Sequence, residues 1–210
     1  MKVGPYMSNI TLPPADNQLP SPESAREELT RGVGRLLLTE VEIRQRIAEL
    51  GAQISDDYAG LNPLLIGVLK GVIFFMSDLL RSINIPVTVD FMAISRYDPL
   101  HKKKGPVRLI KDLDESVEGR HLIFVEDIID TGLTLSYLLR ILKARSPASL
   151  EVCTLFTKPE HRLVDVPLKY TGFDLPDRFV VGYGLDFKGA YRHLPFLAEL
   201  RPEVLQLGPK

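Results

Sequence analysis

The chain has 210 residues, a formal net charge of −1 and 25% charged residues, which is ordinary for a soluble globular protein. This length fits one domain with a sizeable core and a small appendage. The near-neutral charge shows no global basic surface for nucleic acid or an anionic membrane. No apolar run approaches membrane-spanning length, and the first residues lack the pattern of a secretory signal, so we expect a cytoplasmic location.

The first thirty or so residues differ from the rest in composition. Five prolines stand among small polar residues in the first 22 positions, which is typical of a mobile extension with little packing of its own. The segment SPESAREEL within it is compatible with a short helix. We therefore predict an extension over residues 1–32 and one folded domain over residues 33–210.

Cysteine and histidine give no sign of a redox or zinc site. Cys153 is the only cysteine, and its apolar setting EVCTLF favours a buried structural thiol over a nucleophile. The histidines show neither HxxxH nor Cys/His spacing, which argues against zinc; they are His101, His121, His161 and His193.

The first half of the predicted domain alternates strands and helices. Thr39 and Glu42 have the spacing of a capping box at the start of a helix. The continuous apolar run PLLIGVLKG is typical of a strand covered on both faces. In chain order we predict strand 35–38, helix 41–59, strand 63–71, helix 71–83 and strand 87–95.

The second half continues the same alternation. We predict a long polar stretch 96–106, a strand 107–113, a strand from residue 122, a helix 134–146, a strand 150–158 and a strand 179–187. Strands alternating with helices predict an α/β fold with a mainly parallel twisted sheet flanked by helices. Ligands of such sheets bind at the carboxyl ends of the strands. Chemically reactive residues stand at four of these predicted ends: Lys70-Gly71, Glu126-Asp127, Lys158 and Asp186.

The segment LIFVEDIIDTGLT places three carboxylates within five positions at the end of a buried strand. Glu126, Asp127 and Asp130 would repel one another and cost free energy to desolvate. A cation or a hydroxyl-rich ligand would offset that cost. Carboxylates at such a strand end suit ribose hydroxyls or a hydrated Mg²⁺, whereas the simpler alternative is a solvated strand end.

The turn over residues 130–134 precedes a predicted helix. The backbone N–H groups at a helix start are unsatisfied and suit a phosphate-sized anion. Gly132 permits close approach, and Thr131 and Thr134 add hydroxyl donors. A plain helix cap is the simpler alternative for this turn alone. The GxxxxGK[ST] and GxGxxG patterns are absent, so neither a nucleoside-triphosphatase loop nor a dinucleotide fingerprint is indicated.

The segment VEDIIDTGLT resembles the phosphoribosyl-pyrophosphate (PRPP) signature of type I phosphoribosyltransferases. Over residues 34–200 the chain further resembles the hypoxanthine-guanine phosphoribosyltransferase family in its bacterial form, through LIGVLKG, VDFMAIS, FTKPEHR and FVVGYGLDFKGAYR. The resemblance implies the type I phosphoribosyltransferase fold, with a small hood assembled from the N- and C-terminal parts, and Mg²⁺ as cofactor. It also implies a homodimer or homotetramer with no nucleic-acid or membrane partner.

The resemblance implies a role for each matching residue. Asp130 matches the proposed general base, which takes the purine N7 proton. The family residues that bind the ribose and 5′-phosphate of PRPP correspond here to Glu126, Asp127, Asp130, Thr131, Gly132, Leu133 and Thr134. Those that bind the pyrophosphate correspond to Leu69, Lys70 and Gly71, in a loop with an unusual peptide bond, and to Arg192. Those that bind the purine correspond to Lys158, Phe179, Val180 and Asp186, and those that bind Mg²⁺ to Glu126, Asp127 and Asp186.

Two of these assignments have a direct chemical reason. Lys158 can donate to a carbonyl oxygen but cannot accept, which favours a 6-oxo over a 6-amino purine. Phe179 can stack on any base and so contributes affinity more than discrimination.

One departure from the family pattern is the mobile loop, which here reads Ser95-Arg96-Tyr97-Asp98-Pro99. Ser95 and Tyr97 keep the family positions, whereas Arg96 and Pro99 are less usual and put the details of loop closure in doubt.

The resemblance implies an activity with two alternatives. The expected reaction converts hypoxanthine or guanine plus PRPP to IMP or GMP plus pyrophosphate, through an oxocarbenium-like transition state. A xanthine-preferring relative is the first alternative, because the purine 2-substituent is read mostly by backbone. A non-catalytic regulator that senses PRPP or nucleotide is the second. The retained Asp130, Lys158 and Arg192 argue against the regulator.

Overall fold

The computed structural model describes the backbone of residues 30–98 and 103–206, and the side chains of residues 30–95 and 107–206. The chain divides into two units, Met1–Arg31 and Gly32–Lys210, and every element below belongs to the second. The predicted extension, with its short helix, lies almost wholly outside the described residues and stays a prediction. Every helix in the described part of the chain is too short or too polar to cross a membrane.

A six-stranded sheet of order β4-β3-β2-β5-β6-β7 forms the centre of the second unit. Its strands are β2 (Leu64–Val68), β3 (Thr88–Asp98), β4 (Lys103–Lys111), β5 (His121–Ile129), β6 (Ser149–Thr157) and β7 (Tyr170–Asp174). All neighbours are parallel except β3 and β4, which pair antiparallel. The predicted α/β fold with a mainly parallel sheet is confirmed.

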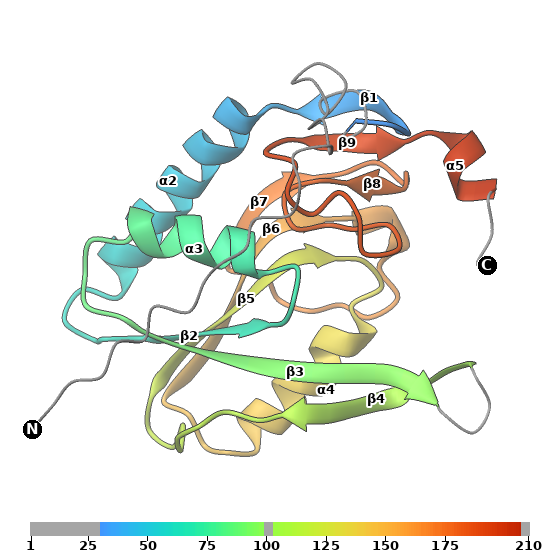
Figure 1. Ribbon diagram of the computed structural model, residues 1–210. Coiled ribbons are helices and arrows are strands. Elements are labelled where there is room, and N and C mark those ends of the chain that lie inside the picture. Colours follow the sequence, from blue (N-terminus) through green and yellow to red (C-terminus); the bar gives the residue numbers. More distant parts are fainter. Residues whose placement is uncertain (1–29, 99–102, 207–210) are drawn as a thin grey trace, which may run out of the picture. The chain divides into compact units, whose positions relative to one another are not determined.

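Helices cover both faces of this sheet (Figure 1). Helices α2 (Glu40–Asp57) and α3 (Ile73–Ser82) pack on one face, and α4 (Leu133–Lys143) packs on the other. Strand β2 shows why both faces are apolar, because alternate side chains point to opposite sides. Leu65 packs with α2 and α3, whereas Leu64 and Ile66 pack with α4. The continuous apolar run in the sequence is the signature of this double burial.

Helix α2 begins where the sequence predicts. The hydroxyl of Thr39 accepts from the backbone N–H of Glu42 at 3.3 Å, and the carboxylate of Glu42 accepts from the backbone N–H of Thr39 at 2.8 Å. This reciprocal pair is a capping box, which satisfies two N–H groups that the helix start would leave open.

A second sheet of three strands, order β1-β9-β8, forms the hood. It joins β1 (Val33–Leu38) to β8 (Val180–Val181) and β9 (Leu197–Leu200), all antiparallel, and helix α5 (Pro202–Gln206) follows. A hood built from the two ends of the domain was expected. The strand predicted over 179–187 is wrong beyond Val181, because the backbone turns at Gly182 and Gly184, whose φ angles are 101° and 95°. Glycine adopts such angles at no steric cost.

The β3–β4 hairpin also departs from the prediction. Strand β3 continues past Ser95 to Asp98, and β4 begins at Lys103, so most of the polar stretch 96–106 is paired strand. Polar residues are compatible with strand here because β4 is an edge of the sheet. The short strands β7 and β9 were not predicted at all.

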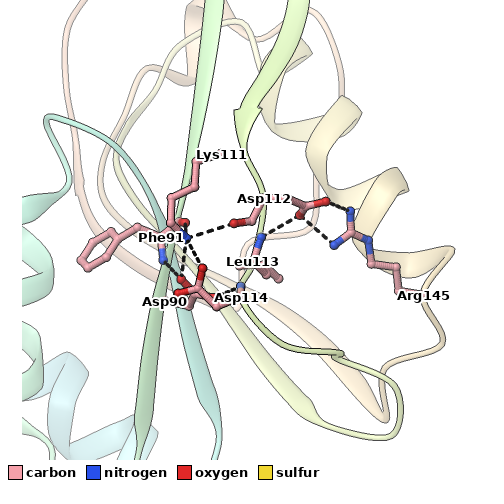
Figure 2. Close-up of polar contacts among 7 residues, drawn as sticks. All are labelled: Asp90, Phe91, Lys111, Asp112, Leu113, Asp114 and Arg145. Carbon is pink, nitrogen blue, oxygen red and sulfur yellow. Dashed lines mark hydrogen bonds and ion pairs between the residues drawn. The ribbon is translucent and has the colours of Figure 1, made fainter.

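Ionic contacts anchor the base of this hairpin (Figure 2). The ammonium of Lys111, at the end of β4, lies 3.1 Å from carboxylate oxygens of both Asp90 and Asp114. The backbone N–H of Asp114 donates to the second oxygen of Asp90 at 2.7 Å. Beside it, Arg145 after α4 donates two bonds to Asp112, at 2.8 and 2.7 Å. These contacts fix the end of β4 to β3 and to the end of α4.

Candidate active site

Two adjoining cavities lie at the carboxyl edge of the sheet. The first, of about 440 Å³, is lined by the end of β2, the end of β5 and the turn into α4. The second, of about 300 Å³, lies between the segment after β6 and the hood. Asp127 and Asp130 line both cavities. The strand-end residues that the sequence singles out therefore meet in one place, as parallel topology dictates.

The turn that precedes α4 has a backbone suited to an anion. Gly132 is the N-cap, with φ 79° and ψ −9°, and offers no side chain to cap the helix, while the N–H of Leu133 makes a long bond of 3.5 Å to the hydroxyl of Thr131. A Cβ at Gly132 would lie 2.8 Å from the carbonyl oxygen of Val164, so both the φ angle and the space require glycine. The hydroxyl of Thr134 lines the first cavity, is buried and has no hydrogen-bond partner. An unsatisfied buried hydroxyl beside open helix N–H groups fits a phosphate.

The loop after β2 forms another wall of the first cavity. The Leu69–Lys70 peptide bond is cis, and the backbone N–H of Leu69 donates to the carbonyl of Met92 at 3.0 Å. A Cβ at Gly71 would collide with the carboxylate of Asp127. The space at this position of the loop therefore requires glycine.

The acidic pair at the end of β5, Glu126 and Asp127, is half-buried. Burial raises the pKa of Asp127, and the nearby guanidinium of Arg192 opposes that rise. Oδ1 of Asp127 accepts from the backbone N–H of Ile128 at 2.8 Å. Glu126, its neighbour, lines the first cavity. A ligand that offers a positive charge or hydroxyl donors would stabilise the ionised form of Asp127.

Asp186 and Arg192, which the sequence assigns to different ligands, are partners in the structure. Arg192 Nη2 lies 2.5 Å from Oδ1 of Asp186, and Nη1 donates to the carbonyl of Gly184 at 2.6 Å. The backbone N–H of Gly189 donates to Oδ2 of Asp186 at 2.7 Å. Both side chains line the second cavity, on the side that faces Asp127.

The carboxylates of the site suit a divalent cation only if other ligands complete its coordination. Among the described residues, no group of three or more His, Cys, Asp or Glu is arranged to hold a metal ion unaided. Mg²⁺ commonly keeps several waters and is bound by one or two carboxylates together with substrate phosphates. Asp127 and Asp186 fit that pattern, since the charge of Asp186 raises the pKa of Asp127 and a cation between them would oppose that rise.

The purine-side residues line the second cavity. Lys158 directly follows β6, and its ammonium donates to the carbonyl of Arg178 at 2.5 Å. Phe179 is 44% exposed, with its ring edge-on to Phe187 at 5.6 Å between centroids. Val180 is buried in β8. One aromatic face and one ammonium are thus brought to the same cavity from distant parts of the chain.

The structure says less about the two predicted positions of the mobile loop, Ser95 and Tyr97. Ser95 lies on β3 beside Ile94, which lines the first cavity, whereas the side chain of Tyr97 lies outside the described residues.

Cys153 is completely buried in the core, as the apolar sequence around it predicts, and burial raises the pKa of its thiol.

One contact in the site escaped the sequence reasoning. His161 Nδ1 lies 2.8 Å from Oδ1 of Asp130, and His161 Nε2 lies 2.8 Å from Oδ2 of Asp177. The spacing of His161 from the other histidines and from Cys153 indicates no zinc site and gives no sign of this contact. Its place three residues after Lys158, at the carboxyl end of a strand, was the signal that could have revealed it.

Comparison with known proteins agrees with this geometry. Residues 37–188 match the phosphoribosyl transferase domain family. The hypoxanthine-guanine phosphoribosyltransferase of Streptococcus agalactiae serotype V is 47% identical over 84% of this chain and 98% of its own length. That of Mycobacterium avium is 46% identical over 89% of this chain and 95% of its own.

A solved structure agrees as well. The hypoxanthine phosphoribosyltransferase of Staphylococcus aureus in its tetragonal crystal form superposes with a TM-score of 0.79 at 42% identity, over 84% of this chain and 96% of that one. The family model spans every residue that lines the two cavities except Arg192. The chain belongs to the hypoxanthine-guanine phosphoribosyltransferase family.

Proposed function

We propose that the chain transfers the phosphoribosyl group of PRPP to hypoxanthine or guanine in purine salvage, releasing pyrophosphate. The observation that carries the proposal is the pair of adjoining cavities that share Asp130. One cavity is lined by carboxylates, hydroxyls and the start of a helix, which suit a sugar phosphate, and the other is lined by an aromatic ring and an ammonium, which suit a purine. A reaction between two ligands needs both held in line at one reacting carbon, which such a shared wall provides.

PRPP would occupy the first cavity. Its 5′-phosphate would accept from the open N–H groups and hydroxyls of residues 131–134, and its ribose hydroxyls would donate to Glu126 and Asp127. The pyrophosphate would lie against residues 69–71, within reach of Arg192. The support for this placement is the unpartnered hydroxyl of Thr134 and the tight backbone at Gly71.

The purine would occupy the second cavity, stacked on Phe179. The ammonium of Lys158 would donate to the 6-oxo group, after leaving the carbonyl of Arg178 that it contacts now. As N9 attacks C1 of the ribose and the bond to pyrophosphate breaks, Asp130 would take the proton from N7. Positive charge that develops on the ribose is favoured by the nearby carboxylates, and Arg192 neutralises the leaving group.

Asp127 and Asp186, with Glu126 nearby, would hold Mg²⁺ together with the substrate. When bound, the cation supplies positive charge to the oxygens of the pyrophosphate. The residues of the chain itself would bind and orient the two substrates, and Asp130 would accept the proton. By family membership we also propose a homodimer or homotetramer in the cytoplasm.

The test is nucleotide formation from PRPP and Mg²⁺ with hypoxanthine, guanine, xanthine and adenine offered separately. Turnover of the first two but not adenine is expected. Turnover of xanthine alone would replace the proposal by the xanthine-preferring alternative. No turnover of any base, with PRPP still bound, would point instead to the nucleotide-sensing regulator.

A further inference from the structure

His161 lies between two carboxylates. Its Nδ1 is 2.8 Å from Asp130 and its Nε2 is 2.8 Å from Asp177. A carboxylate can only accept, and an imidazole offers a donor at both nitrogens only when it is protonated. The hydrogen bonds to Asp130 and to Asp177 accordingly raise the pKa of His161. The ring can therefore donate to both neighbours at once.

The segment that carries His161 is held by backbone hydrogen bonds to the turn over residues 130–134. His161 ends the short helix η1 (Pro159–His161), and its N–H donates to the carbonyl of Lys158 at 3.1 Å. The N–H groups of Leu163 and Val164 both donate to the carbonyl of Thr131, at 3.0 and 3.2 Å. The imidazole and Asp130 thus stand on two segments that are held together by backbone bonds.

Asp130, in contrast, needs a partner to be held in place. Its side chain is 54% exposed, so an unpaired carboxylate here would sample several rotamers. The bond to His161 engages Oδ1, which leaves Oδ2 of the same carboxylate to accept a proton. Asp130 lines both cavities, so its orientation decides whether that oxygen faces a bound purine.

We propose that His161 is a positioning residue of the transferase reaction, which orients Asp130 through Nδ1 and is itself held by Asp177 through Nε2. This inference rests on the proposed function of Asp130 as the proton acceptor. His161 contacts Asp130 and is not among the residues that line the two cavities, so its loss should act on the chemical step and spare the binding of both substrates.

The first experiment compares four variants in steady-state kinetics. Loss of the ring in His161→Ala should lower kcat by about 10- to 100-fold, with the KM values for purine and PRPP changed less than about twofold, because a misplaced catalytic group affects the chemical step. Asn places its amide nitrogen where Nδ1 was, so His161→Asn should recover most of kcat. Gln places its amide nitrogen near Nε2, so His161→Gln should remain as slow as the alanine variant. Glu160→Ala, in the same short helix, is the matched control and should leave kcat unchanged.

A second measurement asks whether His161 acts through Asp130. In an Asp130→Asn background, His161→Ala should cost less than about twofold, because coupled residues are not additive. Asp177→Asn should lower the pKa of His161 in an NMR titration and lower kcat by less than His161→Ala does.

The outcomes separate the two proposals. An inactive wild-type chain would overturn the proposed function. An active chain in which Ala, Asn and Gln at position 161 all match wild type would overturn the positioning role alone. Equal losses for Asn and Gln, or an undiminished loss in the Asp130→Asn background, would also overturn it.

Discussion

Arg192 and Asp186 form an ion pair at 2.5 Å while a second nitrogen of the same guanidinium holds the carbonyl of Gly184 at 2.6 Å. The planar fork of arginine makes the two contacts through two nitrogens held in one fixed plane, whereas a lysine would have to make both from a single nitrogen on a flexible stem. The pair therefore fixes the segment after β8 and orients the positive charge toward the cavity that Asp127 and Asp186 share.

Arg192→Lys should raise the KM for PRPP and lower kcat/KM for PRPP by about 10- to 100-fold, which corresponds to the loss of one charged hydrogen bond. The KM for the purine should change far less. Kinetics with PRPP varied at saturating purine measure this effect. Equal losses for both substrates would show that the pair only holds the fold.

Asp130→Asn should lower turnover by about 10²- to 10⁴-fold, the usual contribution of a general base. The variant keeps the size of the side chain and an acceptor oxygen, so PRPP binding should persist. Calorimetry of PRPP binding, run beside the kinetics, tests both halves of this prediction. Unchanged turnover would remove Asp130 from the role of base.

Lys158→Ala should weaken purine binding selectively, by about 10- to 100-fold in KM, because it removes a charged donor to the 6-oxo group. The KM for PRPP should stay within about twofold of wild type. The comparison requires hypoxanthine and PRPP to be varied in turn. A parallel loss for PRPP would count against the purine contact.

Asp112 offers a test of stability against pH. The bond from Arg145 lowers the pKa of Asp112 in the folded chain, so the contact stabilises above the unfolded pKa and is lost as pH falls through the folded value. Asp112→Asn should cost about 0.5–1 kcal/mol at pH 7, since the pair is bidentate but partly exposed. The cost should shrink as the pH falls below about 4.

Denaturant unfolding at pH 7 and pH 3 measures this cost. An Arg145→Met background supplies the control, because Asp112→Asn should then be nearly neutral at pH 7. A cost that is the same at both pH values would mean that packing, and not the ion pair, is responsible.

Local patterns in the sequence were enough to predict much of the central fold. The capping box at Thr39 and the apolar run of β2 each encode their own structure over a few neighbouring residues. The strand predicted over 179–187 failed because the turn at Gly182 and Gly184 depends on backbone angles that hydrophobicity does not report. Strands β7 and β9 are short and acquire their pairing from distant neighbours, so no local pattern marks them.

Some features of the site could likewise be predicted from the sequence, whereas others depend on contacts between residues far apart in the chain. Residues at strand ends were predicted because parallel topology alone brings those ends to one edge. The contact of His161 with Asp130 joins residues 31 positions apart, and its geometry depends on a short helix and a later loop. The pairing of Asp186 with Arg192 was likewise hidden, since each residue was matched to a separate ligand.

The backbone contact between Gly71 and Gly184 has a consequence for how this protein should be studied. A Cβ at Gly184 would collide with the carbonyl oxygen of Gly71, and a Cβ at Gly71 would collide with Asp127. The seam between the loop after β2 and the segment after β8 is therefore made of backbone in direct contact. Truncation of a side chain to alanine, the usual survey of a site, removes nothing from this glycine-to-glycine contact. Substitutions that add atoms at Gly71 or Gly184 probe it instead.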